Sequence, residues 1–336
     1  MTINEIKSLL KTSEYDFLRT EKCLQNNISI ITLGGSHAYG TNVATSDIDI
    51  RGMVVPTADD IIIGTNFEQF IDTPTDTVFY GLDKQLELLS ECNPNTIEIL
   101  GCLPEQYIHV NQYGQMILDN KSIFLSKKAI PRFAGYANQQ LYRLKQKSLC
   151  AMSEEEYNDH IAKVIMGMKE HLTRAFGFDV TDCIQAYEKD GHLMFDVHFD
   201  TIDDTKFIGL VDEVKTTINN YKKKSNRNKK AIEHEKLNKH AMHLVRLYMM
   251  GIDLLTKQEI NTYRSGADHE LLMDIRNKKY FDSNNMPTEE FFDIVRDYEQ
   301  RFEYAKKHTE LPDNPNYEAI NQLKYDIKSH ILYGGI

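Results

Sequence analysis

The segment Leu33–Gly52, LGGSHAYGTNVATSDIDIRG, constrains the fold of this chain more than any other. It follows Ile28–Leu33, a run rich in β-branched residues that predicts a buried strand. A Gly-Gly-Ser turn ends this strand, and after a polar loop the pattern Asp-Ile-Asp-Ile begins at Asp47. Strict alternation places Asp47 and Asp49 on one face of an extended segment and the isoleucines on the other. We therefore expect a second strand that buries its isoleucines and leaves both carboxylates in a cleft.

These residue types suit a metal and a triphosphate. Side chains two apart on a strand lie about 6.6–7 Å apart at the backbone, so two carboxylates can converge on a pair of metal ions roughly 3.5–4 Å apart. Mg²⁺ commonly bridges one or two carboxylates to substrate phosphates. The small residues Gly35 and Ser36 let a phosphate approach backbone N–H groups and a hydroxyl. A Gly-Ser turn or an Asp-x-Asp alone is more often structural, but their order predicts a site for two Mg²⁺ ions, with Mn²⁺ as an alternative.

The same residues resemble a known superfamily, the DNA polymerase β-like nucleotidyltransferases, whose signature is Gly-Ser followed by Asp-x-Asp. More narrowly, Gly35–Gly40 with Ser46–Gly52 resembles the predicted nucleotidyltransferase group called RNA ligase-associated, or YcgL-like. Further blocks resemble this group in the same order: Asn93–Leu100, Gly135–Arg143, Lys239–Leu247 and Leu271–Asn277.

The resemblance implies a third carboxylate, which in this superfamily comes from a neighbouring strand and completes the metal site. Asp76 is the candidate because it opens a β-prone run, and its structural alternative is a turn or cap residue after a proline. Asp72 is the second choice. Asp59 and Asp60 are less favoured because they lie in the turn-like sequence PTADD.

A long amphipathic helix is predicted from Lys239 onward, with His240, His243 and Arg246 outside its apolar stripe. The forked, permanently charged guanidinium of Arg246 suits a triphosphate or an RNA phosphate. We expect His243 and Arg246 to contact the nucleotide. A transition-metal site at His240 and His243 is the alternative, but the sequence shows no obvious third ligand.

Several other polar residues have structural interpretations at least as good as functional ones. Asn93 caps a predicted helix start, and Glu98 serves its first turn. Arg51 follows the second aspartate and favours a salt bridge as much as a catalytic role. His37 lies inside the glycine turn, where either solvent or a phosphate would suit it.

Length and pattern indicate two domains of the α+β class. With 336 residues, 41% of them hydrophobic, the chain can bury a substantial core. Residues 1–125 predict a small α/β catalytic domain with a mixed sheet, and residues 126–336 a mainly helical domain that binds substrate. A hairpin is expected within 183–210, around Asp190 and Gly191. Predicted helices of the second part cover Lys127–Lys147, Glu154–Phe176, Lys239–Lys257, Asp268–Arg276, Glu289–His308 and Tyr317–Tyr333.

Charge and cysteine content narrow the partners and the compartment. A net charge of −11 argues against nonspecific binding to long nucleic acid. Local RNA contact remains open at the basic run Lys222–Lys230 and at Tyr142–Lys147. No apolar run approaches the roughly 20 residues that span a bilayer, so no membrane partner is expected. Five scattered cysteines predict neither a disulfide framework nor a zinc site, which favours the cytoplasm.

The combined prediction is a metal-dependent nucleotidyltransferase. It would transfer NMP from an NTP to an acceptor hydroxyl, on RNA or tRNA as first choice, with release of pyrophosphate. The proposed catalytic and metal-binding residues are Asp47, Asp49 and Asp76, and the nucleotide-binding residues are Gly35, Ser36, His243 and Arg246. The alternatives are a non-catalytic nucleotide- or RNA-binding module and NMP transfer to a protein side chain. The sequence indicates neither the preferred base nor the oligomeric state.

Overall fold

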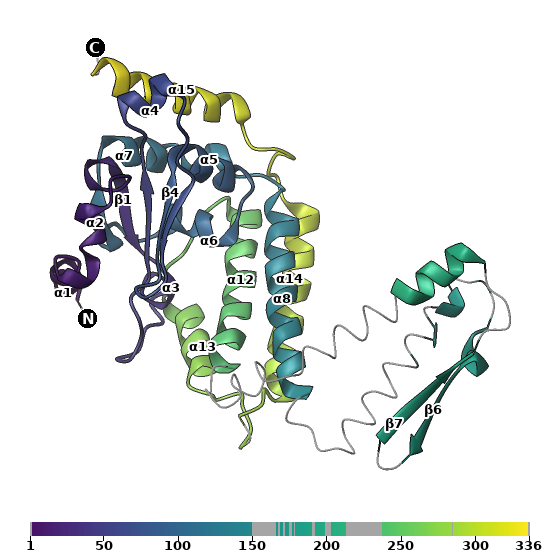
Figure 1. Ribbon diagram of the computed structural model, residues 1–336. Coiled ribbons are helices and arrows are strands. Elements are labelled where there is room, and N and C mark those ends of the chain that lie inside the picture. Colours follow the sequence, from purple (N-terminus) through teal and green to yellow (C-terminus); the bar gives the residue numbers. More distant parts are fainter. Residues whose placement is uncertain are drawn as a thin grey trace. The chain divides into compact units, whose positions relative to one another are not determined.

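The computed structural model describes residues 2–149, 166, 169–170, 172–174, 177, 179–189, 192–198, 203–212, 237–283 and 285–334 (Figure 1). The chain divides into two compact units. The first comprises Met1–Leu141, Asn238–Phe281 and Thr288–Ile336, and the second comprises Tyr142–Leu237 and Asp282–Pro287. The first unit contains residues from both sides of position 125, and the domain boundary expected there stays a prediction.

A five-stranded mixed sheet forms the centre of the first unit, in the order β3-β4-β2-β1-β5. Its strands are β1 (Ile28–Leu33), β2 (Ile50–Val54), β3 (Gln69–Asp72), β4 (Thr77–Gly81) and β5 (Tyr107–Val110). The β2–β4 pair is parallel and the other pairs are antiparallel. Every residue of β1 is buried, as expected for a central strand covered on both faces. The α+β class expected from the sequence is confirmed.

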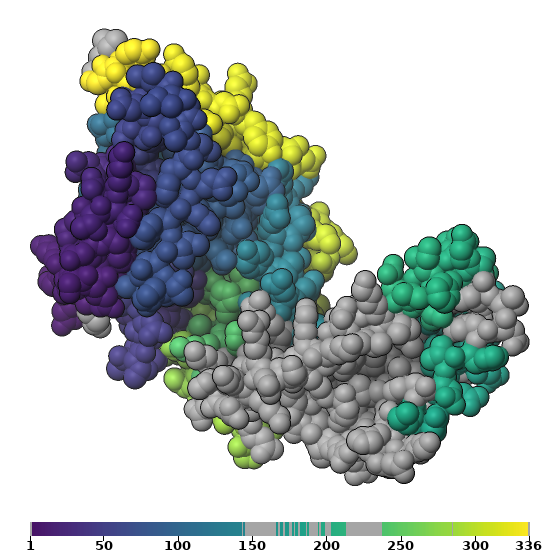
Figure 2. All heavy atoms as spheres, in the orientation of Figure 1, coloured from purple at the N-terminus to yellow at the C-terminus, as the bar shows by residue number. Residues whose placement is uncertain are grey.

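Helices cover the sheet on both faces. α5 (Leu82–Ser90) contacts β2 and β4, and α7 (Gln112–Asp119) contacts β1 and β5. α15 (Tyr317–Tyr333) lies on α5 and α7 and also touches α4 (Ala58–Ile63), as the yellow and blue atoms in Figure 2 show. The N-terminal helices α1 (Ile3–Leu9) and α2 (Phe17–Thr20) contribute Ile6, Leu10 and Leu18 to a core cluster with sheet residues.

Three long helices contribute to the first unit: α8 (Ala129–Leu149) as far as Leu141, α12 (Leu237–Lys257) from Asn238 onward, and α14 (Glu289–His308). They pack closely at Gly251 of α12, where an added β-carbon would lie 2.7 Å from the Phe302 ring and 3.3 Å from Phe133. Glycine therefore permits the close approach of all three helices. α13 (Gly266–Arg276) follows α12.

The remaining short elements are the helices α3 (Gly35–Tyr39) and α6 (Pro94–Ile97) and the 3₁₀ helices Ser13–Tyr15, Gln25–Asn27, Glu98–Gly101, Pro104–Gln106, Lys121–Phe124 and Thr181–Cys183. In the second unit, β6 (Ile184–Lys189) and β7 (His192–Val197) form an antiparallel hairpin, and residues 204–212 form a helix. This hairpin lies within the range 183–210 in which one was expected. Its predicted turn residues, Asp190 and Gly191, lie outside the described residues.

The predicted helices of the C-terminal part have close counterparts in α8, α12, α13, α14 and α15. Most of the helix predicted over Glu154–Phe176 falls outside the residues that the structure describes. Within the described ranges, no helix combines the length and the apolar character needed to cross a bilayer.

Candidate active site

The Gly-Ser turn connects β1 to the short helix α3. Gly34 is extended, whereas Gly35 has φ +52°, a left-handed conformation that L side chains rarely adopt. The helix ends at Gly40, with φ +75°. The amide of Gly34 donates to the carbonyl of Asp49 at 2.8 Å, which joins the turn directly to the acidic segment.

The acidic segment precedes β2 and does not belong to it, since the strand begins at Ile50. Ile50 is fully buried and Ile48 packs against the same core, while Asp47 is exposed and Asp49 is half-buried. The carboxylates thus face away from the core, as the alternation in the sequence predicts. They lie on an irregular segment that the Gly34–Asp49 hydrogen bond holds next to the end of β1 and the start of β2.

Gly35 makes room for Asp49. A β-carbon at Gly35 would lie 1.5 Å from Oδ2 of Asp49, so this carboxylate lies directly over the glycine. Besides the close approach of a phosphate that its small size would allow, Gly35 therefore has a steric role.

Gly35→Ala is therefore expected to lower activity through displacement of Asp49. Gly64→Ala is a matched control, because Gly64 also has a left-handed φ of +80° but its added β-carbon would meet no atom within 4 Å. Both variants should lose roughly 1–2 kcal/mol of stability from backbone strain, but only Gly35→Ala should lower nucleotidyl transfer, by about 10²-fold. Thermal unfolding and initial rates measure the two effects. Equal rates for the two variants would contradict the steric role.

Asp76 lies beside Asp49 because of the parallel register of β2 and β4, in which Ile50 pairs with Thr77. Burial, then a hydrogen bond with the Asp76 carboxyl, raises the pKa of Asp49 from 3.8 to about 7. Asp76 has a φ of +45° and forms a 3.2 Å ion pair with Arg51. In this structure, Arg51 therefore forms a salt bridge, which was one of its two expected roles.

The second choice for the third carboxylate has a local role. Asp72 accepts hydrogen bonds from the amide and the hydroxyl of Thr75, at 3.1 and 2.7 Å, and so closes the turn before β4. In the less favoured PTADD segment, Asp60 belongs to the capping box of α4.

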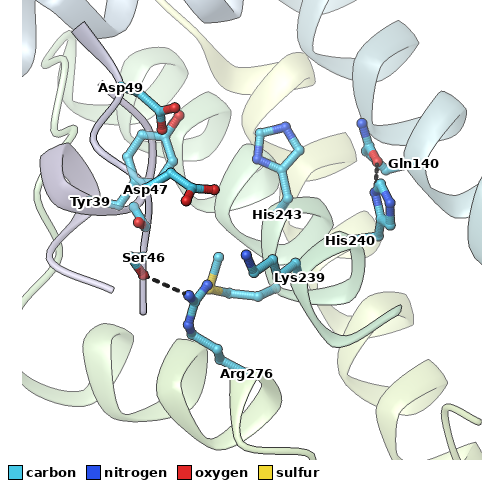
Figure 3. Close-up of a pocket in the computed structure, with 11 residues that line it drawn as sticks. Tyr39, Ser46, Asp47, Asp49, Gln140, Lys239, His240, His243 and Arg276 are labelled. Carbon is cyan, nitrogen blue, oxygen red and sulfur yellow. Dashed lines mark hydrogen bonds between the residues drawn. The ribbon is translucent and has the colours of Figure 1, made fainter. Parts of the chain in front are cut away.

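A pocket of about 350 Å³ opens beside the aspartates. Ser36, Tyr39, Ser46, Asp47 and Asp49 line one side, and Gln140, Lys239, His240, Met242, His243 and Arg276 line the other. In Figure 3, the acidic side chains face basic and imidazole side chains from α12 and α13. The volume falls in the range typical of small-ligand pockets, about 300–1,000 Å³.

Arg276 is the most constrained cation of this pocket. It is only 6% exposed, and its guanidinium donates to the Ser46 hydroxyl at 3.0 Å. Among the described residues it has no carboxylate partner, and burial lowers its pKa. Because a buried charge without a counterion is unfavourable, the site favours an anionic ligand at this position.

Arg246 does not line the pocket, contrary to its predicted role as a nucleotide contact. Its side chain is 1% exposed, and it pairs with Glu98 at 3.3 Å. Its guanidinium carbon lies 3.5 Å from the centre of the Tyr39 ring. A direct contact with a phosphate would require this buried pair to open, so the geometry argues against that role and makes Arg246 an internal residue behind the pocket wall.

Of the other predicted residues, some line the pocket and the rest make structural contacts. Ser36 and His243 line the pocket. Asn93 caps α6 as expected, through its side chain and the amide of Asn95. Glu98 is buried and does more than serve a first helical turn, since it accepts hydrogen bonds from Tyr39 and Arg246. His37 is buried rather than exposed to solvent. The basic run Lys222–Lys230 and the side chains of Arg143, Lys145 and Lys147 lie outside the described residues.

Comparison with known proteins agrees with this arrangement. Residues 11–165 match the sequence model of the RNA repair pathway DNA polymerase beta family. This part of the chain is similar to the DNA polymerase β-like nucleotidyltransferases. The resemblance that the glycine turn and the aspartates suggested is thereby confirmed. The match contains the acidic side of the pocket, whereas Lys239, His243 and Arg276 lie beyond it.

One curated relative is similar over a shorter stretch. An uncharacterized 38.9 kDa protein of the nrdC–mobD intergenic region of Enterobacteria phage T4 is 27% identical over 135 residues, which cover 36% of this chain and 40% of that protein. The chain thus spans less than half of this relative's length. No solved structure matches the chain significantly.

The residues present fit a hard divalent cation. The described part of the chain contains no ready cluster of three His, Cys, Asp or Glu side chains, but Mg²⁺ often needs only one or two carboxylates besides substrate oxygens. Asp47 and Asp49 supply such a set. Burial and neighbouring carboxyl groups destabilise the Asp49 anion, and a bound cation would relieve this. Asp76 is paired with Arg51, so its part as the third ligand stays a prediction.

Four polar residues on the helical side of the pocket were not predicted as nucleotide-binding or catalytic residues, namely Gln140, Lys239, His240 and Arg276. His240 was considered only as a metal ligand, but its Nδ1 lies 3.1 Å from Oε1 of Gln140. All four lie in sequence blocks that resemble the narrower family. The polar positions of these blocks were the signal that could have identified them.

Proposed function

We propose that this protein is a metal-dependent nucleotidyltransferase that transfers NMP from an NTP to an acceptor hydroxyl. The observation that carries this proposal is the pocket itself, in which Asp47 and Asp49 face the buried guanidinium of Arg276, which forms no ion pair with a described residue. Carboxylates suit metal ions, and an isolated buried cation suits phosphate. The family match supports a nucleotidyltransferase-type function.

In the proposed mechanism, the acceptor hydroxyl releases its proton to solvent and its oxygen attacks the α-phosphorus. The bond from the α-phosphorus to the oxygen that bridges to the β-phosphate breaks, and pyrophosphate leaves. Asp47 and Asp49, with Asp76 as the proposed third ligand, would hold Mg²⁺ or Mn²⁺. When bound, the metal would neutralise phosphate charge and favour ionisation of the acceptor hydroxyl. Ser36 donates a hydrogen bond to the triphosphate, and Lys239 and Arg276 bind its charge from the opposite wall. Gly35 keeps the space that Asp49 needs.

An RNA or tRNA end is the acceptor that we propose first. The description of the matched family, an RNA repair pathway, supports this choice. The pocket has room for one nucleotide-sized ligand. A net charge of −11 favours a partner that is held locally over a long polyanion. Transfer to a protein side chain and binding without turnover are the competing outcomes of the test.

The test incubates the protein with each α-labelled NTP, Mg²⁺ and either total RNA or a protein mixture. Label transfer to RNA that is lost in Asp47→Ala supports the proposal. Label on protein instead of RNA would show that the acceptor is a protein side chain. Tight nucleotide binding without transfer to any acceptor would favour a binding module.

Arg276→Met should weaken nucleotide binding without unfolding the protein. A hydrogen bond to a charged group contributes about 1.5–3 kcal/mol, so we expect the Kd for Mg²⁺–NTP to rise roughly 10- to 100-fold. Removal of a buried cation without a counterion should leave the ligand-free protein as stable as before or more so. Lys279→Met is the control, because Lys279 is exposed and pairs with Asp274 at 2.6 Å on the surface. Calorimetric titration measures the affinities, and equal affinities for the two variants would exclude Arg276 from the binding site.

A further inference from the structure

A buried polar network lies behind the pocket wall and has no part in the proposed mechanism. Nη1 of Arg246 donates to Oε2 of Glu98 at 3.3 Å, and the Tyr39 hydroxyl donates to the same oxygen at 2.9 Å. The side chains of Arg246 and Glu98 are 1% and 6% exposed. A buried ion pair of this kind often stabilises a protein no more than apolar residues of the same volume would. Stability alone therefore does not explain why these charges are buried here.

The network reaches the pocket at Tyr39, which is one of its lining residues, and at His243. Nη2 of Arg246 lies 3.1 Å from Nδ1 of His243, one helical turn earlier on α12. A guanidinium has only donors, so Nδ1 must be the acceptor in this hydrogen bond. The ring proton of a neutral His243 therefore resides on Nε2. Arg246 itself cannot turn, because its other terminal nitrogen is bound to Glu98 and its face is stacked on Tyr39.

We propose that Arg246 is a positioning residue that fixes His243 as the Nε2-protonated tautomer, and that His243 donates this N–H to a phosphate oxygen of the nucleotide. The inference rests on the proposed function and adds a defined contact to it. The ring lies across the pocket from Asp47 and Asp49, as Figure 3 shows. Among the described residues that line the pocket or contact the ring, the charged groups are these two carboxylates, Lys239, Arg276 and Arg246 itself.

This assignment separates His243 from the other roles that a pocket histidine can have. A metal ligand needs a nitrogen lone pair, but the lone pair of Nδ1 accepts from Arg246 and Nε2 carries the proton. Protonation to imidazolium would turn Nδ1 into a second donor that points at a guanidinium, which breaks the hydrogen bond and sets two cations side by side. His243 is therefore suited to a permanent donor role.

The tautomer can be tested without nucleotide. In a long-range ¹H–¹⁵N spectrum of ¹⁵N-labelled protein, His243 should show a protonated Nε2 and an unprotonated Nδ1. In the double variant Glu98→Gln/Arg246→Met, which removes both charges of the network and retains an acceptor for Tyr39, this fixed state should give way to a mixture of tautomers. A protonated Nδ1 in the wild type, or an unchanged tautomer in the double variant, would overturn the positioning role.

The phosphate contact can be tested with a ligand that has no base or sugar. His243→Leu should weaken binding of Mg²⁺–tripolyphosphate roughly 10- to 100-fold, and the double variant should lose a similar part of the affinity. His243→Gln should restore most of it, because an amide nitrogen can replace the Nε2 donor and Arg246 holds the amide oxygen inward. Equal affinities for wild type and His243→Leu, or no recovery in His243→Gln, would overturn the contact.

Different results would contradict the proposed function and the role of His243. If the wild type transfers label from an NTP and His243→Leu binds tripolyphosphate normally, only the role of His243 is wrong. If the wild type binds neither Mg²⁺–NTP nor tripolyphosphate, both the proposed function and the phosphate contact are wrong.

Discussion

Asp49→Asn should lower nucleotidyl transfer by roughly 10²–10³-fold or more, because an amide is a poor ligand for a hard cation and leaves phosphate charge without its counterpart. The fold should be unaffected, since the position of Asp49 is set by its backbone carbonyl, which accepts from Gly34 at 2.8 Å. Initial rates with saturating Mg²⁺–NTP measure the loss. Asp59→Asn is the control, because Asp59 is an exposed carboxylate in the first turn of α4.

The same variant should be more stable than the wild type when no metal is present. Burial raises the pKa of Asp49 from 3.8 to about 7, so the folded protein binds the proton more tightly than the unfolded chain does. The free energy of unfolding of the wild type should thus fall as pH rises from about 4 to about 7. Asparagine lacks this ionisation, and its advantage should grow over that window to roughly 1–2 kcal/mol above pH 7.

Denaturant unfolding in EDTA at several pH values tests this stability gain. If the difference between Asp49→Asn and the wild type does not depend on pH, Asp49 does not carry an unfavourable charge in the folded state. If Asp49→Asn also transfers NMP at the wild-type rate, the assignment of Asp49 as a metal ligand is wrong.

The acidic half of the site could be predicted because its information is local in the sequence. The β-branched run before Gly34, the glycine turn and the alternation at Asp47–Ile50 each determine a local conformation, and together they place the two carboxylates. Asp76 could be predicted for a similar reason, because the run that follows it, Thr77–Gly81, has the composition of a strand. That Asp76 lies beside Asp49 depends on the parallel pairing of β2 and β4, which the sequence does not indicate.

The basic half could not be predicted because it depends on how α12 and α13 rotate against the sheet. Arg246 and His243 lie on the same polar side of the predicted helix, yet His243 enters the pocket and Arg246 is 1% exposed. The reason is Glu98, a buried carboxylate 148 positions earlier that accepts a hydrogen bond from the Arg246 guanidinium. Arg276 shows the converse case. Nothing in its local sequence predicts that its charge is buried, and only tertiary structure brings it to Ser46.

Loss of either partner of the Glu98–Arg246 pair should strongly destabilise the protein. Removal of one member of a buried ion pair typically costs about 3–5 kcal/mol, because the other charge stays in the interior without a partner. Both side chains are almost fully buried. We therefore expect Glu98→Gln and Arg246→Met to unfold at clearly lower denaturant concentrations at pH 8, whereas the double variant should lose less than the sum of the two.

The two single variants should differ in their response to pH. In Arg246→Met, Glu98 loses its cation, and burial, which already raises the pKa of this carboxyl in the wild type, then acts without opposition from Arg246. A raised pKa in the folded state means that stability increases as pH falls, so Arg246→Met should recover part of its loss between pH 8 and pH 5. Glu98→Gln should recover nothing from this source, because a guanidinium cannot give up its proton in this range. Unfolding curves at pH 8 and pH 5 measure both effects, and equal pH responses of the two single variants would show that Glu98 is not the buried charge that Arg246 neutralises.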